Sequence, residues 1–411
     1  METAELDETR RVTPRKNLPP RVGILGWEML PVGKHPGLGY VDLLLAAIQG
    51  AVADAGLGLA DVEGLYVTPD DFGARETPML AARLPELLGV PTRALALIEC
   101  GGTSGALALK TALQDLRLGH VGIAVVAAGS KTAGGGVQGD PAVFSDRLLH
   151  AQGSMMGPWA LPYATGSAVP FYAMATQRHM LEHGVSAEEI AHLPVVLRSN
   201  AAGNPFAQFR DPITVEDVLA SRIVSPPVHL LECCPMSEGG AAVVLTSEDA
   251  LRRLGRDAVR ITGMGEWHDA SHFTPARGRI DRFPAVERAA AQACASAGID
   301  PREVDVAEVY GVFAATELIT YEAIGFFAEG TAARAVAGGA TGPGMRPAIN
   351  PSGGRLSLGH PPTVTPILET IEVASQLAGR AGPRQIRPAR VGLVQAEHGM
   401  ENGSVVFVLE A

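Results

Sequence analysis

The sequence contains little cysteine, few aromatic residues and no long uninterrupted apolar run. Only four of the 411 residues are cysteines, and 5% are aromatic. No two cysteines have the Cys-x-x-Cys spacing, which argues against a structural zinc site. No run reaches the roughly 18 apolar residues of a membrane span, and no apolar signal core is present. We therefore expect a cytoplasmic protein with reduced thiols and no membrane association.

Positive charge is also scarce. The chain has 33 lysines and arginines against 44 aspartates and glutamates, a formal net charge of −11. This balance argues against nucleic acid or an anionic membrane surface as the main partner. Glycine and apolar residues are abundant, which is typical of an ordered globular protein rich in turns. The charged residues 1–20 are expected to form a flexible leader.

The chain repeats itself. Residues 51–67 (AVADAGLGLADVEGLYV) match residues 293–309 (ACASAGIDPREVDVAEV) at a constant offset of 242 positions. Each copy reads as a helix that ends at glycine, a short acidic turn and a strand. Corresponding elements flank both copies: apolar strands at 21–27 and 258–267, glycine-rich turns at 99–109 and 350–360, and apolar strands at 121–129 and 390–399.

The repeat predicts an α/β protein made of two β-α-β-α-β halves. We place the halves at residues 21–256 and 257–411, with residues 131–230 inserted in the first as a subdomain of helices and loops. Residues 233–255 are expected to return to the main sheet and to start a helix at Ser247. The stretch ECGGTSGALALKTAL is small and apolar on nearly all faces, which predicts a buried central helix.

One glycine-rich segment surrounds a single histidine. Residues 349–362 read INPSGGRLSLGHPP, with His360 near the end. Glycine is placed where the backbone turns sharply or approaches something closely. The segment is therefore either an irregular loop with an incidental histidine or a backbone shaped around a ligand. The prolines that follow suit the first turn of a helix beginning near Thr365.

Several stretches together resemble the thiolase superfamily, in its branch of sterol-carrier-protein and lipid-transfer-type thiolases. They are CCPMSEGGAAVVLTSEDA, EVYGVFAATELITYEAIGF, NPSGGRLSLGHP and NPFAQFRDPITVEDVLASRIVSPP. The resemblance implies two halves stacked as α-β-α-β-α layers and carbon–carbon bond chemistry on acyl-CoA thioesters. It also implies a homodimer, an additional small OB-fold partner as in lipid-transfer-type members, and no bound cofactor, with a coenzyme A thioester as substrate. No metal site is expected.

The resemblance assigns roles to individual residues. His360 corresponds to the general base. Backbone groups of Gly102 and Ser104 would be donors at a helix N-terminus, where positive potential stabilises an oxyanion. In the His360 loop, the corresponding contacts to substrate or coenzyme A fall on Asn350, Ser352, Gly353 and Gly359.

The chain departs from the family pattern at the nucleophile. The register places Gly102 where the family has its cysteine, and Cys100 lies two residues earlier. Cys100 is thus either a displaced nucleophile or a structural thiol. Near the C-terminus QAEHGMENG has no second cysteine. Either His398 or Glu397 takes over its proton exchange, or His398 is a plain turn histidine.

Tyr310 is a further departure, in a position where the family has asparagine or histidine. A tyrosine hydroxyl can donate to an oxyanion or carry a proton. This pattern resembles thiolase-like aldolases that have lost the nucleophile, although Leu358 stands where a second tyrosine is expected. Three functions therefore stay open: a thiolase-like acyltransferase, a retro-aldolase without the covalent cysteine, and a non-catalytic acyl-CoA or lipid-binding subunit.

Two smaller signals carry less weight. The neighbours Cys233 and Cys234 are expected to pack in a core or turn. His268 and His272 are four residues apart, but no carboxylate-bearing helix follows them. A loop or a contact with coenzyme A is therefore favoured over a metal pair.

Overall fold

The computed structural model describes residues 21–70, 79–131, 168–269, 278–342 and 344–411. The expected leader, residues 1–20, lies outside the described residues, as does the part of the expected insertion at 132–167. Among the described helices, none is both long and apolar enough to cross a membrane.

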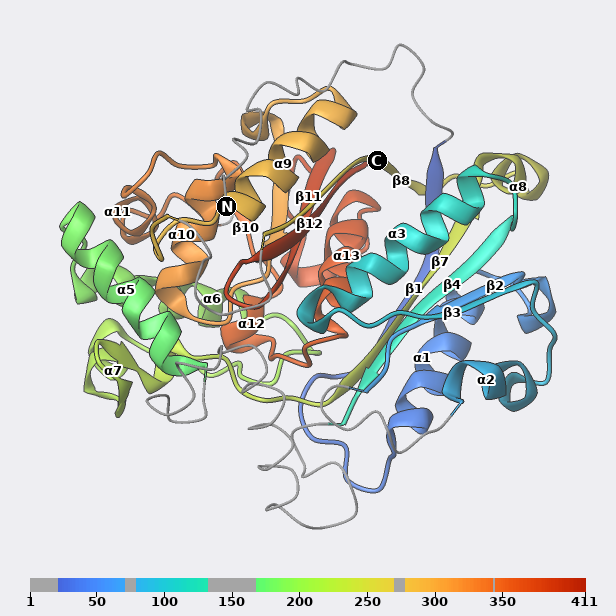
Figure 1. The fold of residues 1–411 in the computed structure, drawn as a ribbon, viewed down its shortest axis with the longest axis horizontal. Coiled ribbons are helices and arrows are strands. Elements are labelled where there is room, and N and C mark those ends of the chain that lie inside the picture. Colours follow the sequence, from blue (N-terminus) through green and yellow to red (C-terminus); the bar gives the residue numbers. More distant parts are fainter. Residues whose placement is uncertain (1–20, 71–78, 132–167, 270–277, 343) are drawn as a thin grey trace, which may run out of the picture.

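Within the described residues, ten strands form one mixed sheet, which is the centre of the fold (Figure 1). They are β1 (Val22–Met29), β2 (Gly64–Val67), β3 (Ala94–Leu97), β4 (Ile123–Ser130), β7 (Gly239–Ser247), β8 (Val259–His268), β9 (Val306–Val309), β10 (Ala348–Ile349), β11 (Val391–His398) and β12 (Gly403–Glu410). Their order across the sheet is β10-β9-β11-β12-β8-β1-β7-β4-β2-β3.

The strand order confirms the predicted duplication. Read outward from the middle, β1-β7-β4-β2-β3 and β8-β12-β11-β9-β10 follow the same sequence of elements. The offset of 242 residues relates β2 to β9, and it also relates the 3-10 helices Leu59–Asp61 and Pro301–Glu303. Both copies end the preceding helix at a left-handed glycine, Gly56 (φ 63°) or Gly298 (φ 76°), which the missing Cβ permits.

Four helices complete the layers. α1 (Tyr40–Asp54) and α9 (Pro284–Ala297) cover the outer faces of the two halves, and α3 (Ser104–Arg117) and α13 (Thr365–Leu377) pack together between them. Every residue of α13 is buried, and α13 contacts strands of both halves. A Cβ on Gly105 of α3 would lie 2.7 Å from the carbonyl oxygen of Thr363, so small residues allow this close approach. The predicted central helix and the helix start at Thr365 are confirmed.

The remaining described elements surround this core. They are α2 (Leu80–Leu88), α5 (Val169–His183), α6 (Ala187–Ala201), α7 (Val215–Ala220), α8 (Glu248–Leu254), α10 (Ala314–Ile324), α11 (Ala332–Ala337), α12 (Gly354–Ser357) and the short pair β5 (Ile223–Ser225) and β6 (Val228–His229). Ser247 caps α8 by accepting from the N–H of Ala250, as the sequence predicts. The extent of the insertion at 131–230 stays a prediction.

Candidate functional site

The phenol of Tyr310 and the imidazole of His360 meet inside the protein. Tyr310 directly follows β9, and His360 lies in the loop between α12 and α13. The Tyr310 hydroxyl oxygen and Nε2 of His360 are 2.7 Å apart and share a hydrogen bond. The rings meet edge to face, and the residues are only 2% and 8% exposed. Two residues that the sequence singles out are therefore in direct contact.

Gly102 lies against this pair, at the turn that leads into α3. A Cβ built on Gly102 would be 2.8 Å from the Tyr310 hydroxyl and 2.4 Å from the carbonyl oxygen of Glu397. Both distances are shorter than any real Cβ contact. The tyrosine hydroxyl thus fills the space that a side chain at residue 102 would need. The glycine at position 102 and the tyrosine at position 310 therefore depend on each other, because the tyrosine fits only where residue 102 has no side chain.

Cys234 contacts the other nitrogen of His360. Its Sγ atom is 3.4 Å from Nδ1, which is within hydrogen-bond range for sulfur. Burial, with the neighbouring Cys233, raises the pKa of the Cys234 thiol. Sequence reasoning expects only core or turn packing for this residue, so its contact with His360 is one that the sequence does not reveal.

The segment that carries Cys234 also holds the His360 backbone. The N–H of His360 donates to Oγ of Ser237 (3.0 Å), and the N–H of Ser237 donates back to the carbonyl of His360 (3.2 Å). Ser237 in turn donates to Gln208 (2.6 Å). The imidazole of His360 is thus oriented in two ways. Ser237 holds its backbone, and Tyr310 and Cys234 contact its two ring nitrogens.

Burial keeps the His360 ring neutral. Burial, with a smaller contribution from the positive charge of Arg355, lowers the pKa of His360 from 6.5 to about 3. A neutral imidazole has one nitrogen that can accept a proton. His360 can therefore take a proton from Tyr310, or pass one to it, within the existing hydrogen bond.

The loop residues predicted to contact substrate are engaged in shaping the loop. Asn350, in the left-handed region (φ 50°), accepts from the N–H of Val309 (2.7 Å) and donates to the Val309 carbonyl (3.1 Å). Ser352 donates to Glu308 (2.7 Å). Gly353 (φ 103°) and Gly359 (φ 114°) occupy backbone conformations that favour glycine. A role for these four in binding coenzyme A stays a prediction.

The turn before α3 is closed by its own side chains. Oγ of Ser104 accepts from the N–H of Cys100 (2.8 Å) and donates to the carbonyl of Gly101 (2.6 Å). Ser104 is completely buried. These bonds fix the turn that brings Gly102 to Tyr310. The N–H of Ser104, which the sequence predicts as an oxyanion donor, donates to the carbonyl of Gly101 in this structure.

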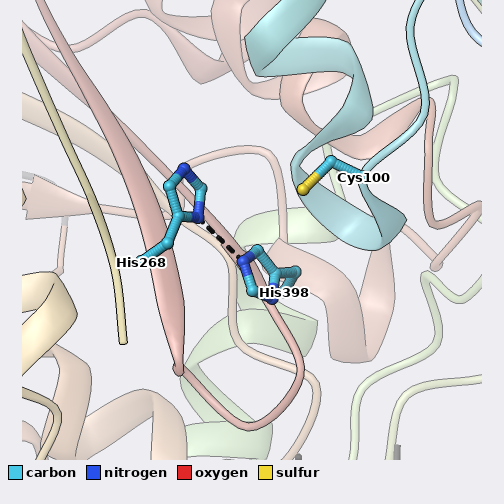
Figure 2. Close-up of side chains that lie close together, drawn as sticks. All are labelled: Cys100, His268 and His398. Atoms are coloured by element: carbon cyan, nitrogen blue, oxygen red, sulfur yellow. Dashed lines mark hydrogen bonds between the residues drawn. The ribbon is translucent and has the colours of Figure 1, made fainter. Parts of the chain in front are cut away.

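Cys100 and His398 lie together, in a cluster apart from the contacts of His360. Nδ1 of His268 is 2.8 Å from Nε2 of His398, and the Cys100 thiol completes a group whose ligand atoms lie within 4.8 Å of one another (Figure 2). Glu397, the alternative to His398, accepts from the N–H of Glu401 (3.1 Å) and directs its backbone carbonyl at Gly102. His272 lies outside the described residues.

The side chains of Asn350 and Ser352 contact a fully buried group of charged side chains, which sequence reasoning also misses. Arg355 is 0% exposed, with Glu308 at 3.6 Å and Glu369 at 3.7 Å. Burial raises the pKa of Glu308 to about 7 and that of Glu317 to about 8. The available signal is a carboxylate inside an apolar strand, as at Glu308 in VAEV, since an unpaired charge there would be costly.

Comparison with known proteins places this arrangement in context. Residues 265–411 match the family described as Thiolase C-terminal domain-like. The chain is 30% identical over 390 residues to an acetyl-CoA acetyltransferase of Methanothermobacter thermautotrophicus, covering 94% of this chain and 98% of that protein. It is 31% identical to sterol carrier protein 2 of Gallus gallus, covering 94% of this chain and 71% of the relative.

Among solved structures, the chain is similar to one titled Ltp2-ChsH2(DUF35) aldolase. The TM-score is 0.81 at 27% sequence identity, and the match covers 96% of this chain and 99% of the other. The similarity to proteins named as an acetyltransferase, a sterol carrier and an aldolase spans almost the whole chain in each case.

Proposed function

Because this chain belongs to the thiolase superfamily, we propose that it makes or breaks a carbon–carbon bond in an acyl-CoA thioester by aldol chemistry, without a covalent cysteine intermediate. The observation that carries the proposal is the place of the Tyr310 hydroxyl. It lies 2.7 Å from Nε2 of His360 and in the space of a residue-102 side chain. A cysteine at position 102 and this tyrosine conformation exclude each other.

Retro-aldol cleavage needs a proton acceptor for a hydroxyl and stabilisation of an enolate, but no nucleophile. In the proposed direction the substrate is a 3-hydroxyacyl-CoA. Its hydroxyl proton moves to the Tyr310 oxygen while the Tyr310 proton moves to Nε2 of His360. The bond between C2 and C3 breaks, C3 becomes the carbonyl carbon of an aldehyde or ketone, and the electron pair remains on C2 as the enolate of a shorter acyl-CoA.

The same proton completes the reaction. It returns from His360 through Tyr310 to C2, which gives the acyl-CoA product and restores both side chains. His360 is neutral in the resting state, so its ring can accept the proton, although its lowered pKa makes it a weak base before charge develops on the substrate. The negative charge that develops on the enolate favours the imidazolium during the step. Run backward, the same groups support aldol addition.

The N–H of Gly102, in the turn that leads into α3, is the proposed enolate donor, because the N–H groups of Thr103 and Ser104 already donate to carbonyls of the same turn. The turn at Gly101–Thr103 leads directly into α3, and a helix N-terminus carries unpaired N–H groups and positive potential. Losing one such donor typically costs about 10²–10³ in rate. Gly102, beside Tyr310, would thus contribute through its backbone.

We also propose that the chain works as an assembly. The structural relative named as an aldolase is titled as a complex with a DUF35 protein, and a small OB-fold partner would fit the same role here. The edge strand β3 exposes Leu95 (38%) and Leu97 (47%), and it leads into the turn that carries Gly102. Pairing of β3 with a second copy would give a C2 homodimer.

The decisive experiment compares Tyr310→Phe with wild type on a 3-hydroxyacyl-CoA. Release of a carbonyl compound and a shorter acyl-CoA is followed by mass spectrometry, with and without a small partner protein. We expect a loss of about 10²–10⁴ in kcat/KM, the usual range for removal of a proton-transfer group. The matched control is Tyr66→Phe, an equally buried tyrosine that donates to Asp115 away from the site. Equal activity of Tyr310→Phe and wild type would end this proposal.

A second candidate is a thiolase-like acyltransferase with Cys100 as nucleophile. It is favoured by the two imidazoles beside the Cys100 thiol, because a neighbouring histidine can activate a thiol. Intact-protein mass after incubation with acetyl-CoA or acetoacetyl-CoA separates the two. An acyl adduct that disappears in Cys100→Ala would support this candidate. Binding of coenzyme A without an adduct or turnover would instead favour a non-catalytic acyl-CoA-binding subunit.

A further inference from the structure

Two histidines meet across a glycine at one end of the sheet. β12 lies between β8 and β11, and its Gly403 pairs with His268 on one side and with His398 on the other. A Cβ at residue 403 would lie 1.9 Å from Nε2 of His398 and 2.5 Å from Nδ1 of His268. Glycine at this position therefore creates the space in which the two rings stack, with their facing nitrogens 2.8 Å apart.

The thiol of Cys100 completes the group from the other half of the chain. Figure 2 shows its sulfur pointing toward the two rings, and the three ligand atoms lie within 4.8 Å of one another. The Cys100 backbone is fixed, because its N–H donates to Ser104 (2.8 Å) and its carbonyl accepts from the hydroxyl of Thr103 (2.8 Å). The group is thus held by three separate elements.

We propose that Cys100, His268 and His398 bind a divalent cation of the zinc type, with a fourth position open to solvent. Zinc holds sulfur at about 2.3 Å and imidazole nitrogen at about 2.0–2.1 Å, so tetrahedral ligand atoms lie about 3.3–3.6 Å apart. The two nitrogens, now 2.8 Å apart, need to separate by about half an ångström. His268 is exposed, which gives an ion a path from solvent.

The surroundings of His268 fit a metal ligand. Its Nε2 is 3.0 Å from Oε1 of Glu266, whose other oxygen binds Lys110. A carboxylate on the far nitrogen of a histidine fixes its tautomer and is the usual outer partner of a zinc-bound imidazole. Nε2 then carries the proton and Nδ1 presents its lone pair. Binding releases the Cys100 thiol proton, and the His398 ring proton moves from Nε2, where it forms the hydrogen bond to Nδ1 of His268, to Nδ1.

A second group of histidines in the described part of the chain is less suited to bind a metal ion. His179, His183 and Asp281 also lie within 4.8 Å of one another. There, however, the guanidinium of Arg279 donates to both oxygens of Asp281 and lies 3.3 Å from Nε2 of His183. A bound cation would face a fixed positive charge, so this group serves as a control.

The test is titration of the chelator-treated, reduced full chain with Co²⁺, followed by absorbance. We expect one Co²⁺ per chain, with the d–d bands of a tetrahedral ion and a near-ultraviolet charge-transfer band from a thiolate ligand, both removed by Zn²⁺. Cys100→Ser should lose the charge-transfer band. Glu266→Gln should weaken binding roughly 10- to 100-fold, as outer partners of metal-bound histidine do.

Control variants test whether the cobalt spectrum comes from the proposed group of Cys100, His268 and His398. Cys233→Ala and His179→Gln should leave the cobalt spectrum unchanged, whereas His398→Gln should abolish the tetrahedral bands. Absence of these bands in the wild type would overturn the proposal, as would a charge-transfer band that persists in Cys100→Ser. The readout is a spectrum and not turnover, so its outcome is independent of the proposed aldol activity.

Discussion

The hydroxyl of Tyr310 occupies the space into which a side chain at Gly102 would project. A Cβ there would also lie 2.4 Å from a backbone oxygen, that of Glu397, which no side-chain rotation can move. The turn before α3 has therefore closed around a residue without a side chain. Restoring the family cysteine requires movement of both the tyrosine and the backbone of β11.

This closure predicts a stability cost for any side chain at position 102. We expect Gly102→Ala to lower the free energy of unfolding by about 1–3 kcal/mol, the usual range for overpacking a tight interior. Urea unfolding followed by circular dichroism measures the change. Gly338→Ala is the matched control, because its backbone angles are ordinary and its nearest atoms would lie 3.4 Å away. If both variants unfolded alike, the space at residue 102 would be open.

The neutral state of His360 predicts an acid-dependent loss of stability. Its pKa is about 3 in the folded protein and 6.5 as the ordinary value, so between these the unfolded chain binds one more proton. Stability should therefore fall as pH decreases from about 6.5 toward 3, by at most about 1.4 kcal/mol per pH unit from this group. His360→Gln should show a shallower decline between pH 4 and 6. An unchanged slope would mean that His360 is protonated normally in the fold.

Glu317 predicts the opposite slope in a different range of pH. Burial raises its pKa from 4.5 to about 8, so the folded protein holds a proton that the unfolded chain has lost. Its contribution is complete below about pH 4.5 and is lost as pH rises toward 8. Glu317→Gln imitates the protonated acid and keeps an acceptor for Tyr321 and Asn350. Its unfolding free energy should vary less between pH 5 and 8, by at most about 1.4 kcal/mol per unit. A parallel pH profile would contradict the raised pKa.

The exposed edge of β3 predicts a change in oligomeric state. Leu97→Glu places a charge on the proposed strand-pairing surface and should shift the protein from dimer to monomer in light scattering after size exclusion. Leu118→Glu is the control, since Leu118 is 69% exposed at the end of α3. Identical masses for the two variants and wild type would place the interface elsewhere, or show that none exists.

Much of the fold is predictable because each half retains the same local signals. Gly56 and Gly298 both end a helix in a left-handed conformation that glycine adopts easily, and they fix the register of the repeat. Short strands such as β3 and β10 have no comparable sequence signal at their ends. β10 has only two residues, and it forms because β9 lies next to it.

The site is only partly predictable. The contact of Tyr310 with His360 joins two residues that the family resemblance already selects. Cys234 reaches His360 through a tertiary bridge at Met236, which no local pattern encodes. The pairing of His268 with His398 depends on Gly403 in the strand between them, and sequence spacing instead associates His268 with His272.

The two halves are packed together within one chain, and this allows corresponding turns of the two halves to differ in sequence. A symmetric dimer of half-length chains would carry the same residue in both copies of a turn. Here the halves are joined in one chain, and α13 of the second packs against β1 and β7 of the first, so association does not depend on concentration. Each turn is then free to specialise. The turn after β3 places Gly102, a residue without a side chain, against Tyr310, while the segment after β10 supplies the imidazole of His360.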